Sequence, residues 1–128
     1  GIPPGDWYAG LQKPWFNPPN WLFAPAWTTL YILIAIAGWR TFLIDRTGPP
    51  MKLWIGQMLL NWTWTPVFFG LHLTWLGLGI ILALAATILA FIIGNWYRDR
   101  LSSLLLLPYL AWVSFAALLN GALAWLNG

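Results

Sequence analysis

Three apolar stretches of the sequence each carry a row of aromatic and uncharged polar side chains. In one of them Trp27 and Tyr31 are four residues apart, so they share a face of a helix. Flat rings that alternate with a few neutral hydrogen-bonding groups suit a planar, largely apolar ligand, so these rows predict a binding pocket. The rows of the other two stretches are Gln57, Asn61, Trp64 and Phe68, and Tyr109, Trp112, Ala116 and Asn120.

The same rows also have a purely structural interpretation. Amides such as Gln57 and Asn61 are costly inside a membrane unless they face other helices, so both are expected to point into the bundle in either case. They could simply hydrogen-bond neighbouring helices while the rings fill the core. If the rows do form a pocket, it would fit a tetrapyrrole, a sterol or a heteroaromatic drug better than an ion.

The sequence offers few ionisable groups for catalysis, proton transport or metal binding. The chain has no cysteine, and its three acids, Asp6, Asp45 and Asp99, lie outside the apolar stretches, which argues against a proton-coupled carrier. No nucleophile–base–acid set and no phosphate-binding glycine loop can be assembled. The single histidine, His72, could ligate a haem iron, but an interfacial histidine is more often solvated. The sequence therefore predicts no required cofactor and no metal site.

The composition indicates an integral membrane protein. The chain is 60% hydrophobic and 7% charged, whereas soluble domains carry about 25% charged residues. Lipid must therefore solvate most of its surface. A soluble four-helix bundle would need a polar stripe on each helix, and residues 74–97 carry no charge at all. The six cations are too few and too scattered for a nucleic-acid surface.

These elements predict an all-α membrane helical bundle in one domain over residues 1–128. Residues 1–20 are rich in proline and are expected to form a structured loop. Prolines also occur inside the apolar stretches, at positions 25, 66 and 108, where kinks are expected. A spanning helix needs about 20 residues. The expected spans are residues 21–44, 53–73, 74–97 and 101–126, with short breaks that make neighbouring helices antiparallel.

The basic residues predict the orientation of the chain. Most Lys and Arg residues follow the first and third spans, and the positive-inside rule then places the loops around Arg46 and Arg98 in the cytoplasm. The loop of residues 1–20 and the C-terminus are expected on the far side. The residues of the positive side are Arg40, Arg46, Lys52, Arg98 and Arg100.

Two further groups of residues have simple interpretations. Aromatic residues near span ends are typical of an interfacial belt. Small residues at four-residue spacing on the third span allow close helix contact, either within one chain or between two chains of a homodimer. The belt residues are Trp21, Trp39, Trp54, Trp75, Trp96, Tyr97 and Trp125, and the small residues are Ala86, Ala90 and Gly94 on one face and Gly79 and Ala83 on another.

Three groups of motifs occur in a characteristic order. The first comprises residues 7–14 (WYAGLQKP), Pro18, Pro19, Trp21, Pro25, Trp27 and residues 29–31; the second comprises Gly56, Gln57, Asn61, Trp62 and residues 66–70 (PVFFG); the third comprises residues 108–112 (PYLAW), Leu119 and Asn120. These motifs resemble the first loop and the second, third and fifth helices of the TspO/translocator protein family. Its members are tryptophan-rich sensory proteins, and its animal members are called peripheral benzodiazepine receptors.

The resemblance implies a five-helix fold that often dimerises, with a pocket beneath the first loop for porphyrins, sterols and benzodiazepine-type ligands. From the matched positions we expect Trp27, Trp64 and Trp112 to stack on the ligand. Tyr8 would close the pocket, and the two amides of the third helix would bond the polar edge of the ligand. The full set of matched pocket positions is Tyr8, Trp27, Gln57, Asn61, Trp64, Trp112, Ala116 and Leu119.

Two departures from the family pattern matter. The sequence begins where the family's first helix should be ending, so either a helix of about 20 residues is missing from it or the protein has four spans. In animal members a Tyr and an Arg of a proposed cholesterol motif follow the position of Asn120, but here Gly121 follows it. The second departure favours a tetrapyrrole over cholesterol.

The leading expectation is therefore a membrane receptor or sensor for porphyrin-type tetrapyrroles, such as protoporphyrin IX or haem, that carries or disposes of them. Its partners would be membrane lipids and a tetrapyrrole or sterol-like molecule, in a bacterial membrane or the mitochondrial outer membrane. The resemblance implies two alternatives. One is light-dependent porphyrin degradation, with Trp27 and Trp112 as the oxidisable groups. The other is a sterol- or lipid-handling protein.

Overall fold

A computed structural model of the protein describes residues 20–70 and 73–127. Its elements are a short 3-10 helix η1 (Asn20–Leu22), α2 (Phe23–Ile44), α3 (Pro49–Thr65), a π-helical turn η2 (Pro66–Gly70), α4 (Thr74–Asn95) and α5 (Arg100–Asn127). These described ranges contain no strand. Apart from Asn20, the expected loop of residues 1–20 lies outside the described residues, as do Tyr8 and His72.

Three of the helices are long and apolar enough to cross a membrane, over Ala24–Ile44, Thr74–Asn95 and Arg100–Asn127. The remaining helix, α3, has 17 residues and continues into η2. At 1.5 Å per residue α3 alone is about 25 Å long, close to the thickness of the hydrocarbon core. The predicted fold class, an all-α membrane helical bundle, is confirmed.

The turn between α2 and α3 is built by Asp45. Its backbone is extended where α2 ends, and its Oδ1 accepts the N–H groups of Thr47 and Gly48 at 3.3 and 3.1 Å. Pro49 and Pro50 then occupy the first positions of α3, where a missing N–H costs no helical hydrogen bond. The helix therefore begins at Pro49, ahead of the expected Leu53.

The three prolines inside apolar stretches have different effects. Pro25 lies in the first turn of α2, and Pro108 lies inside α5, which is continuous from Arg100 to Asn127. At Pro66 the α-helical pattern changes to π-helix, because proline has no N–H for the preceding turn. The N–H of Leu73 then donates to the carbonyl of Val67 at 3.1 Å and leads the chain towards α4.

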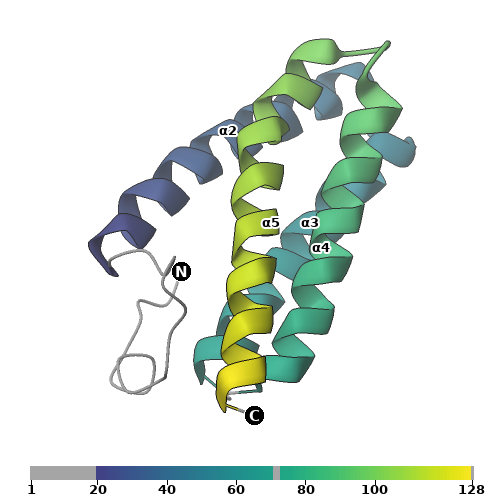
Figure 1. The fold of residues 1–128 in the computed structure, drawn as a ribbon. Coiled ribbons are helices and arrows are strands. Elements are labelled where there is room, and N and C mark those ends of the chain that lie inside the picture. The colour runs from purple at the N-terminus through teal and green to yellow at the C-terminus, as the bar shows by residue number, and fades with distance from the viewer. Residues whose placement is uncertain (1–19, 71–72, 128) are drawn as a thin grey trace.

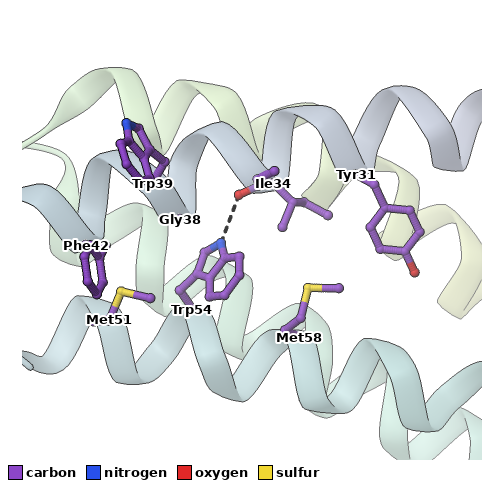
Figure 2. A pocket seen from close by; sticks show the side chains of 9 residues that line it. Tyr31, Ile34, Gly38, Trp39, Phe42, Met51, Trp54 and Met58 are labelled. Carbon is purple, nitrogen blue, oxygen red and sulfur yellow. Dashed lines mark hydrogen bonds between the residues drawn. The ribbon is translucent and has the colours of Figure 1, made fainter. Parts of the chain in front are cut away.

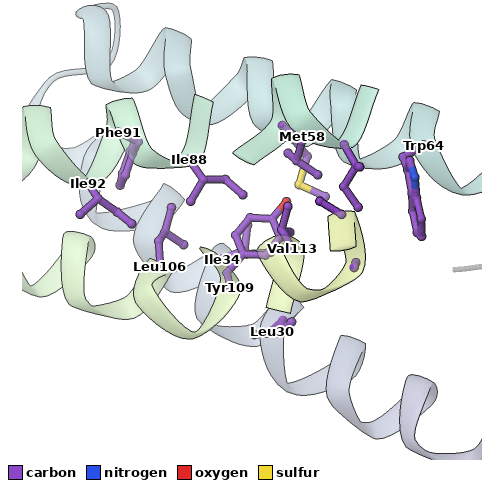
Figure 3. Close-up of a cluster of buried hydrophobic side chains, with 14 of the residues drawn as sticks. Leu30, Ile34, Met58, Trp64, Ile88, Phe91, Ile92, Leu106, Tyr109 and Val113 are labelled. Carbon is purple, nitrogen blue, oxygen red and sulfur yellow. The ribbon is translucent and has the colours of Figure 1, made fainter. Parts of the chain in front are cut away.

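α4 packs against both α3 and α5, whereas α2 and α3 contact each other sparsely (Figure 1). α2 packs mainly on α5 and diverges from the other helices towards its N-terminal end (Figure 1). The core lies between the four helices (Figure 3). Its fully buried members include Ile34, Ile81, Leu84, Ile88, Phe91, Leu106, Tyr109 and Val113.

The outer surface of the bundle is apolar, as lipid exposure requires. Five of the expected belt residues, Trp21, Trp39, Trp75, Tyr97 and Trp125, are exposed, whereas Trp54 and Trp96 are half-buried. The five small residues predicted for helix contact on the third span are all exposed, and a Cβ added at Gly79 or Gly94 would meet nothing within 4 Å. Within the described chain these small residues therefore do not provide the close helix contact considered from the sequence.

One end of the bundle, where α2 and α4 end and α3 and α5 begin, carries the basic residues and is called the basic end here. Arg40 Nη2 lies 2.9 Å from Asp99 Oδ1, which ties α2 to the turn before α5. Ser102 also donates to Asp99. Burial alone would raise the pKa of Asp99, but the hydrogen bonds from Arg40 and Ser102 lower it more, so the pKa lies below its ordinary value.

Candidate ligand-binding site

Four polar side chains from three helices form one hydrogen-bonded series, called the polar chain here. The hydroxyl of Tyr31 on α2 donates to Asn61 Oδ1 on α3 at 2.7 Å, and Asn61 Nδ2 donates to the hydroxyl of Tyr109 on α5 at 2.7 Å. Tyr109 in turn donates to Gln57 Oε1 at 2.8 Å. The amides predicted to face inward thus join α3 to α2 and to α5.

Three members of the polar chain are buried and Tyr31 is half-buried, and the groups satisfy one another. Gln57 and Tyr109 have no exposed surface and Asn61 has 2%. Gln57 Nε2 also lies 3.8 Å from the sulfur of Met58. No buried side-chain nitrogen or oxygen in the described part of the chain lacks a partner. In hydrocarbon an unpaired amide or phenol would cost several kcal/mol, on the order of 2–7, so this pairing holds the three helices in one arrangement.

An aromatic cluster covers the polar chain; we call it the aromatic cage and define it as Trp27, Tyr31, Tyr109 and Trp112. The ring of Trp27 lies 5.7 Å from that of Tyr31 and 6.4 Å from that of Tyr109. Trp27 also meets Trp112 edge to face, at 6.4 Å and 86°. Both indoles are half-buried, whereas Tyr109 is fully buried. The aromatic cage therefore combines two half-buried tryptophans with two tyrosines whose hydroxyls belong to the polar chain.

A second cluster lies at the other predicted row positions. Trp64 Nε1 donates to Asn120 Oδ1 at 2.9 Å, and Asn120 Nδ2 donates to the backbone carbonyl of Thr74 at 2.7 Å. The ring of Trp64 stacks on Phe68 at 5.2 Å and 19°. Gly77 makes room for this contact, because a Cβ there would lie 3.1 Å from Asn120 Oδ1. This cluster joins α3, α4 and α5.

The structure thus divides the predicted site residues into two groups. Trp64, although expected to stack on the ligand beside Trp27 and Trp112, is 7% exposed, and its N–H is used by Asn120. The expected closure by Tyr8 lies outside the described residues. One group is Trp27, Tyr31, Gln57, Asn61, Tyr109 and Trp112; the other is Trp64, Phe68 and Asn120; Ala116 and Leu119 are buried in the core on α5.

Sequence reasoning missed two contributors to these clusters. Thr74 takes part through its backbone carbonyl, which no side-chain pattern could reveal. Gly77 is one of several glycines of α4 and has no spacing that distinguishes it from Gly79. Trp62, a residue of the second motif group, faces outward and is 60% exposed.

The arrangement is suited to binding rather than to acid–base catalysis. The polar groups of both clusters are neutral amides, phenols and an indole N–H. Among the described residues no group of three or more His, Cys, Asp or Glu could hold a metal ion. Aromatic faces with a few placed hydrogen-bonding groups are the usual lining of a site for a flat organic ligand.

Comparison with known proteins decides the family. The model of the TspO/MBR family matches residues 2–126, which is nearly the whole chain. This protein belongs to the TspO/MBR family. The match confirms the resemblance seen in the motifs, whose described residues lie on η1, α2, α3, η2 and α5.

Members of the TspO/MBR family from all three domains of life are similar to this chain. It is 43% identical over 124 residues to the tryptophan-rich protein TspO of Archaeoglobus fulgidus, covering 94% of this chain and 80% of that relative. It is 37% identical over 123 residues to the tryptophan-rich sensory protein of Cereibacter sphaeroides, covering 93% and 75%. It is 39% identical over 127 residues to the translocator protein of Homo sapiens, covering 89% and 70%.

Proposed function

We propose that this protein is a membrane receptor or sensor that binds porphyrin-type tetrapyrroles at the aromatic cage. The observation that carries the proposal is the position of Trp27 and Trp112, two half-buried indoles from different helices that meet edge to face at 6.4 Å. A flat macrocycle can stack on such rings and gain burial of apolar surface as well as ring–ring contact.

The polar chain supports this choice of ligand. Two of its members, Tyr31 and Tyr109, contact the ring of Trp27, and all of its polar groups are neutral. An ion would need charged or multiple oxygen ligands, whereas a tetrapyrrole needs flat walls and a few neutral contacts. The names of relatives, tryptophan-rich sensory protein and translocator protein, are consistent with sensing or carriage of a small molecule. In the proposed orientation the basic end, with Arg46 and Arg98, faces the cytoplasm.

The proposal is tested by titrating the detergent-solubilised protein with protoporphyrin IX while recording tryptophan fluorescence. The unmodified protein should show saturable quenching. In a Trp27→Phe/Trp112→Phe variant the dissociation constant should rise about tenfold, which corresponds to about 1.4 kcal/mol of lost contact.

The matched control is a Trp75→Phe/Trp125→Phe variant. It also removes two indoles, but both are exposed near span ends, at 54% and 80%. Its dissociation constant should equal that of the unmodified protein. Equal affinities in all three proteins would contradict binding at the aromatic cage, and the absence of saturable quenching would favour sterol or lipid handling instead.

Light-dependent porphyrin degradation is a second candidate, favoured by one feature of the aromatic cage. Trp27 lies within 6.4 Å of three other oxidisable rings, those of Tyr31, Tyr109 and Trp112. Illumination of bound protoporphyrin in the presence of oxygen would then bleach its absorbance faster than in a protein-free control. With the Trp27→Phe/Trp112→Phe variant, the bleaching rate should fall to that of the protein-free control. Equal bleaching rates with and without the unmodified protein would contradict light-dependent degradation.

A further inference from the structure

The basic end of the bundle carries more positive charge than its ion pairs balance. Arg40 pairs with Asp99, and Arg98 pairs with Asp45 at 3.6 Å. Among the described residues no carboxylate pairs with the other cations of this end, which are therefore available to an anionic partner. These cations are Arg46, Lys52 and Arg100, and all three are exposed.

Two of the three cations lie at the turn between α2 and α3. The guanidinium carbon of Arg46 lies 5.9 Å from the centre of the Phe42 ring, and Lys52 follows Met51 on α3. Phe42 and Met51 line a cavity of about 470 Å³ between these two helices (Figure 2). No hydrogen bond within the described part of the chain holds either cation, so both side chains would lose conformational freedom on binding an anion.

The third cation, Arg100, is held in place at the turn between α4 and α5. Its Nε donates to the backbone carbonyl of Trp96 at 3.3 Å, and its guanidinium carbon lies 5.0 Å from the centre of the Trp96 ring. Its terminal amino groups make no hydrogen bond to another described residue. The adjacent carboxylate of Asp99 is 6% exposed and pairs with Arg40, so it does not neutralise Arg100. A guanidinium held in this way can donate two N–H groups to one phosphate at a small cost in side-chain entropy.

Apolar surface continues from Arg100 along the outside of α5. Leu104 follows Arg100 by four residues, so the two share a face of the helix, and Leu107 lies three residues further on. Both leucines are exposed, at 43% and 41%. Tyr97, which precedes Arg100 in the turn, is 92% exposed, and tyrosines are typical of the headgroup level of a membrane. The turn therefore places a fixed cation at the headgroup level and apolar helix surface next to it at the level of the acyl chains.

We propose that this surface, called the Arg100 site and defined as Arg100, Leu104 and Leu107, binds an anionic phospholipid from the leaflet at the basic end. The headgroup phosphate accepts hydrogen bonds from the terminal amino groups of Arg100, and an acyl chain lies along the two leucines. Phosphatidylcholine also has a phosphate, but its choline cation is repelled by the guanidinium, so a lipid with net negative charge is preferred. A neutral sterol would leave the guanidinium unused, and a free phosphate would leave the leucines unused.

The test uses native mass spectrometry to measure the dissociation constant of the first lipid that binds to the delipidated protein. Phosphatidylglycerol and phosphatidylcholine with the same acyl chains are compared. Phosphatidylglycerol should bind about fivefold more tightly, as expected for one cation that meets an anionic headgroup. In Arg100→Gln the dissociation constant for phosphatidylglycerol should rise about fivefold, and that for phosphatidylcholine should stay the same. Leu104→Gln should raise the dissociation constants for both lipids, because it places an amide against the acyl chain.

Two matched controls separate the Arg100 site from general lipid contact. Arg46→Gln/Lys52→Gln removes two other exposed cations of the basic end, neither of which is fixed by a hydrogen bond within the described chain. It should change the dissociation constant for phosphatidylglycerol by less than about twofold. Leu76→Gln makes the same change as Leu104→Gln at a leucine that is 54% exposed at the opposite end of the bundle. It should bind both lipids as the unmodified protein does.

Several results would overturn the proposal. Equal dissociation constants for the two lipids in the unmodified protein would show that no anionic headgroup is selected. A loss in Arg46→Gln/Lys52→Gln as large as that in Arg100→Gln would show attraction to the charge of the whole basic end and no site at Arg100. Unchanged binding in Leu104→Gln, or displacement of the lipid by glycerol phosphate alone, would show that the acyl chain does not lie on α5.

Discussion

At the residue scale, Asn61 links the candidate site to the rest of the bundle. It accepts from Tyr31 on α2 and donates to Tyr109 on α5, so one amide on α3 fixes the positions of two tyrosines. Both tyrosines belong to the aromatic cage. A change at Asn61 should therefore affect stability and ligand binding together.

The first prediction concerns the coupling of Asn61 and Tyr109. Asn61→Val should lower the free energy of unfolding in detergent by about 1–3 kcal/mol, because it leaves the part-buried hydroxyl of Tyr31 without its acceptor and the buried hydroxyl of Tyr109 without its donor. Combined with Tyr109→Phe in a double-mutant cycle, it should give a coupling energy of about 0.6–1.7 kcal/mol. Additive losses would show that the 2.7 Å contact between the two side chains contributes nothing.

The second prediction concerns Gly38. Gly38→Ala should destabilise the protein by about 1–3 kcal/mol, because the new methyl group overlaps the Trp54 ring, which its bond to Ile34 holds in place. Gly79→Ala is the control, since a Cβ there meets nothing within 4 Å. It should leave stability unchanged or raise it by up to about 1 kcal/mol, as expected for alanine in a helix. Thermal unfolding followed by circular dichroism would distinguish the two, and equal midpoints would contradict the prediction.

At the scale of elements, α2 makes the least contact with the other described helices. It diverges from the bundle at its N-terminal end and contacts α3 sparsely, and polar contacts also attach it. Tyr31 anchors its middle and Arg40 its C-terminal half. The partner of Arg40, Asp99, is 6% exposed and precedes α5, so the ion pair joins the first described span to the last.

The third prediction is the pH dependence of that attachment. The pKa of Asp99 is lower in the folded protein than its ordinary value of about 3.9. Its stabilising contribution is therefore complete at neutral pH, begins to fall as the pH nears the ordinary value, and is lost as the pH falls through the folded value. Asp99→Asn should lower the melting temperature at pH 7, and the difference from the unmodified protein should shrink below about pH 4. A difference that is constant with pH would contradict this role.

At the scale of the whole molecule, the helices alternate in direction, so the turns between them lie at two ends. The α2–α3 and α4–α5 turns share the basic end, and the α3–α4 connection and the end of α5 share the other. Lipid faces the apolar outer surface between these ends. The polar chain lies inside the bundle.

The fourth prediction tests this topology with single cysteines, since the natural chain has none. Thr47→Cys and Tyr97→Cys should react with a membrane-impermeant maleimide from the same side of the membrane. Leu73→Cys and Leu126→Cys should react only from the opposite side. The positive-inside rule assigns the first pair to the cytoplasm. Labelling of Thr47→Cys and Tyr97→Cys from opposite sides would contradict the antiparallel arrangement.

Much of the fold could be predicted because a chain that is surrounded by lipid can adopt few kinds of backbone structure. A chain with 7% charged residues cannot be covered by water, and every backbone group in lipid must be paired within a helix or a closed barrel. The change to π-helix at Pro66 was not predicted: a missing N–H removes a hydrogen bond but does not specify which geometry replaces it.

The candidate site was predictable only as rows on separate helices. Helical periodicity places Gln57 and Asn61 on one face with Trp64 and Phe68, and the cost of amides in lipid turns that face inward. Periodicity within one helix says nothing about the rotation or crossing of its neighbours. Tertiary packing alone therefore decided that Asn61 donates to Tyr109 and that Trp64 donates to Asn120 instead of lying beside Trp112. It also decided that α2 and α3 separate and leave a cavity between them.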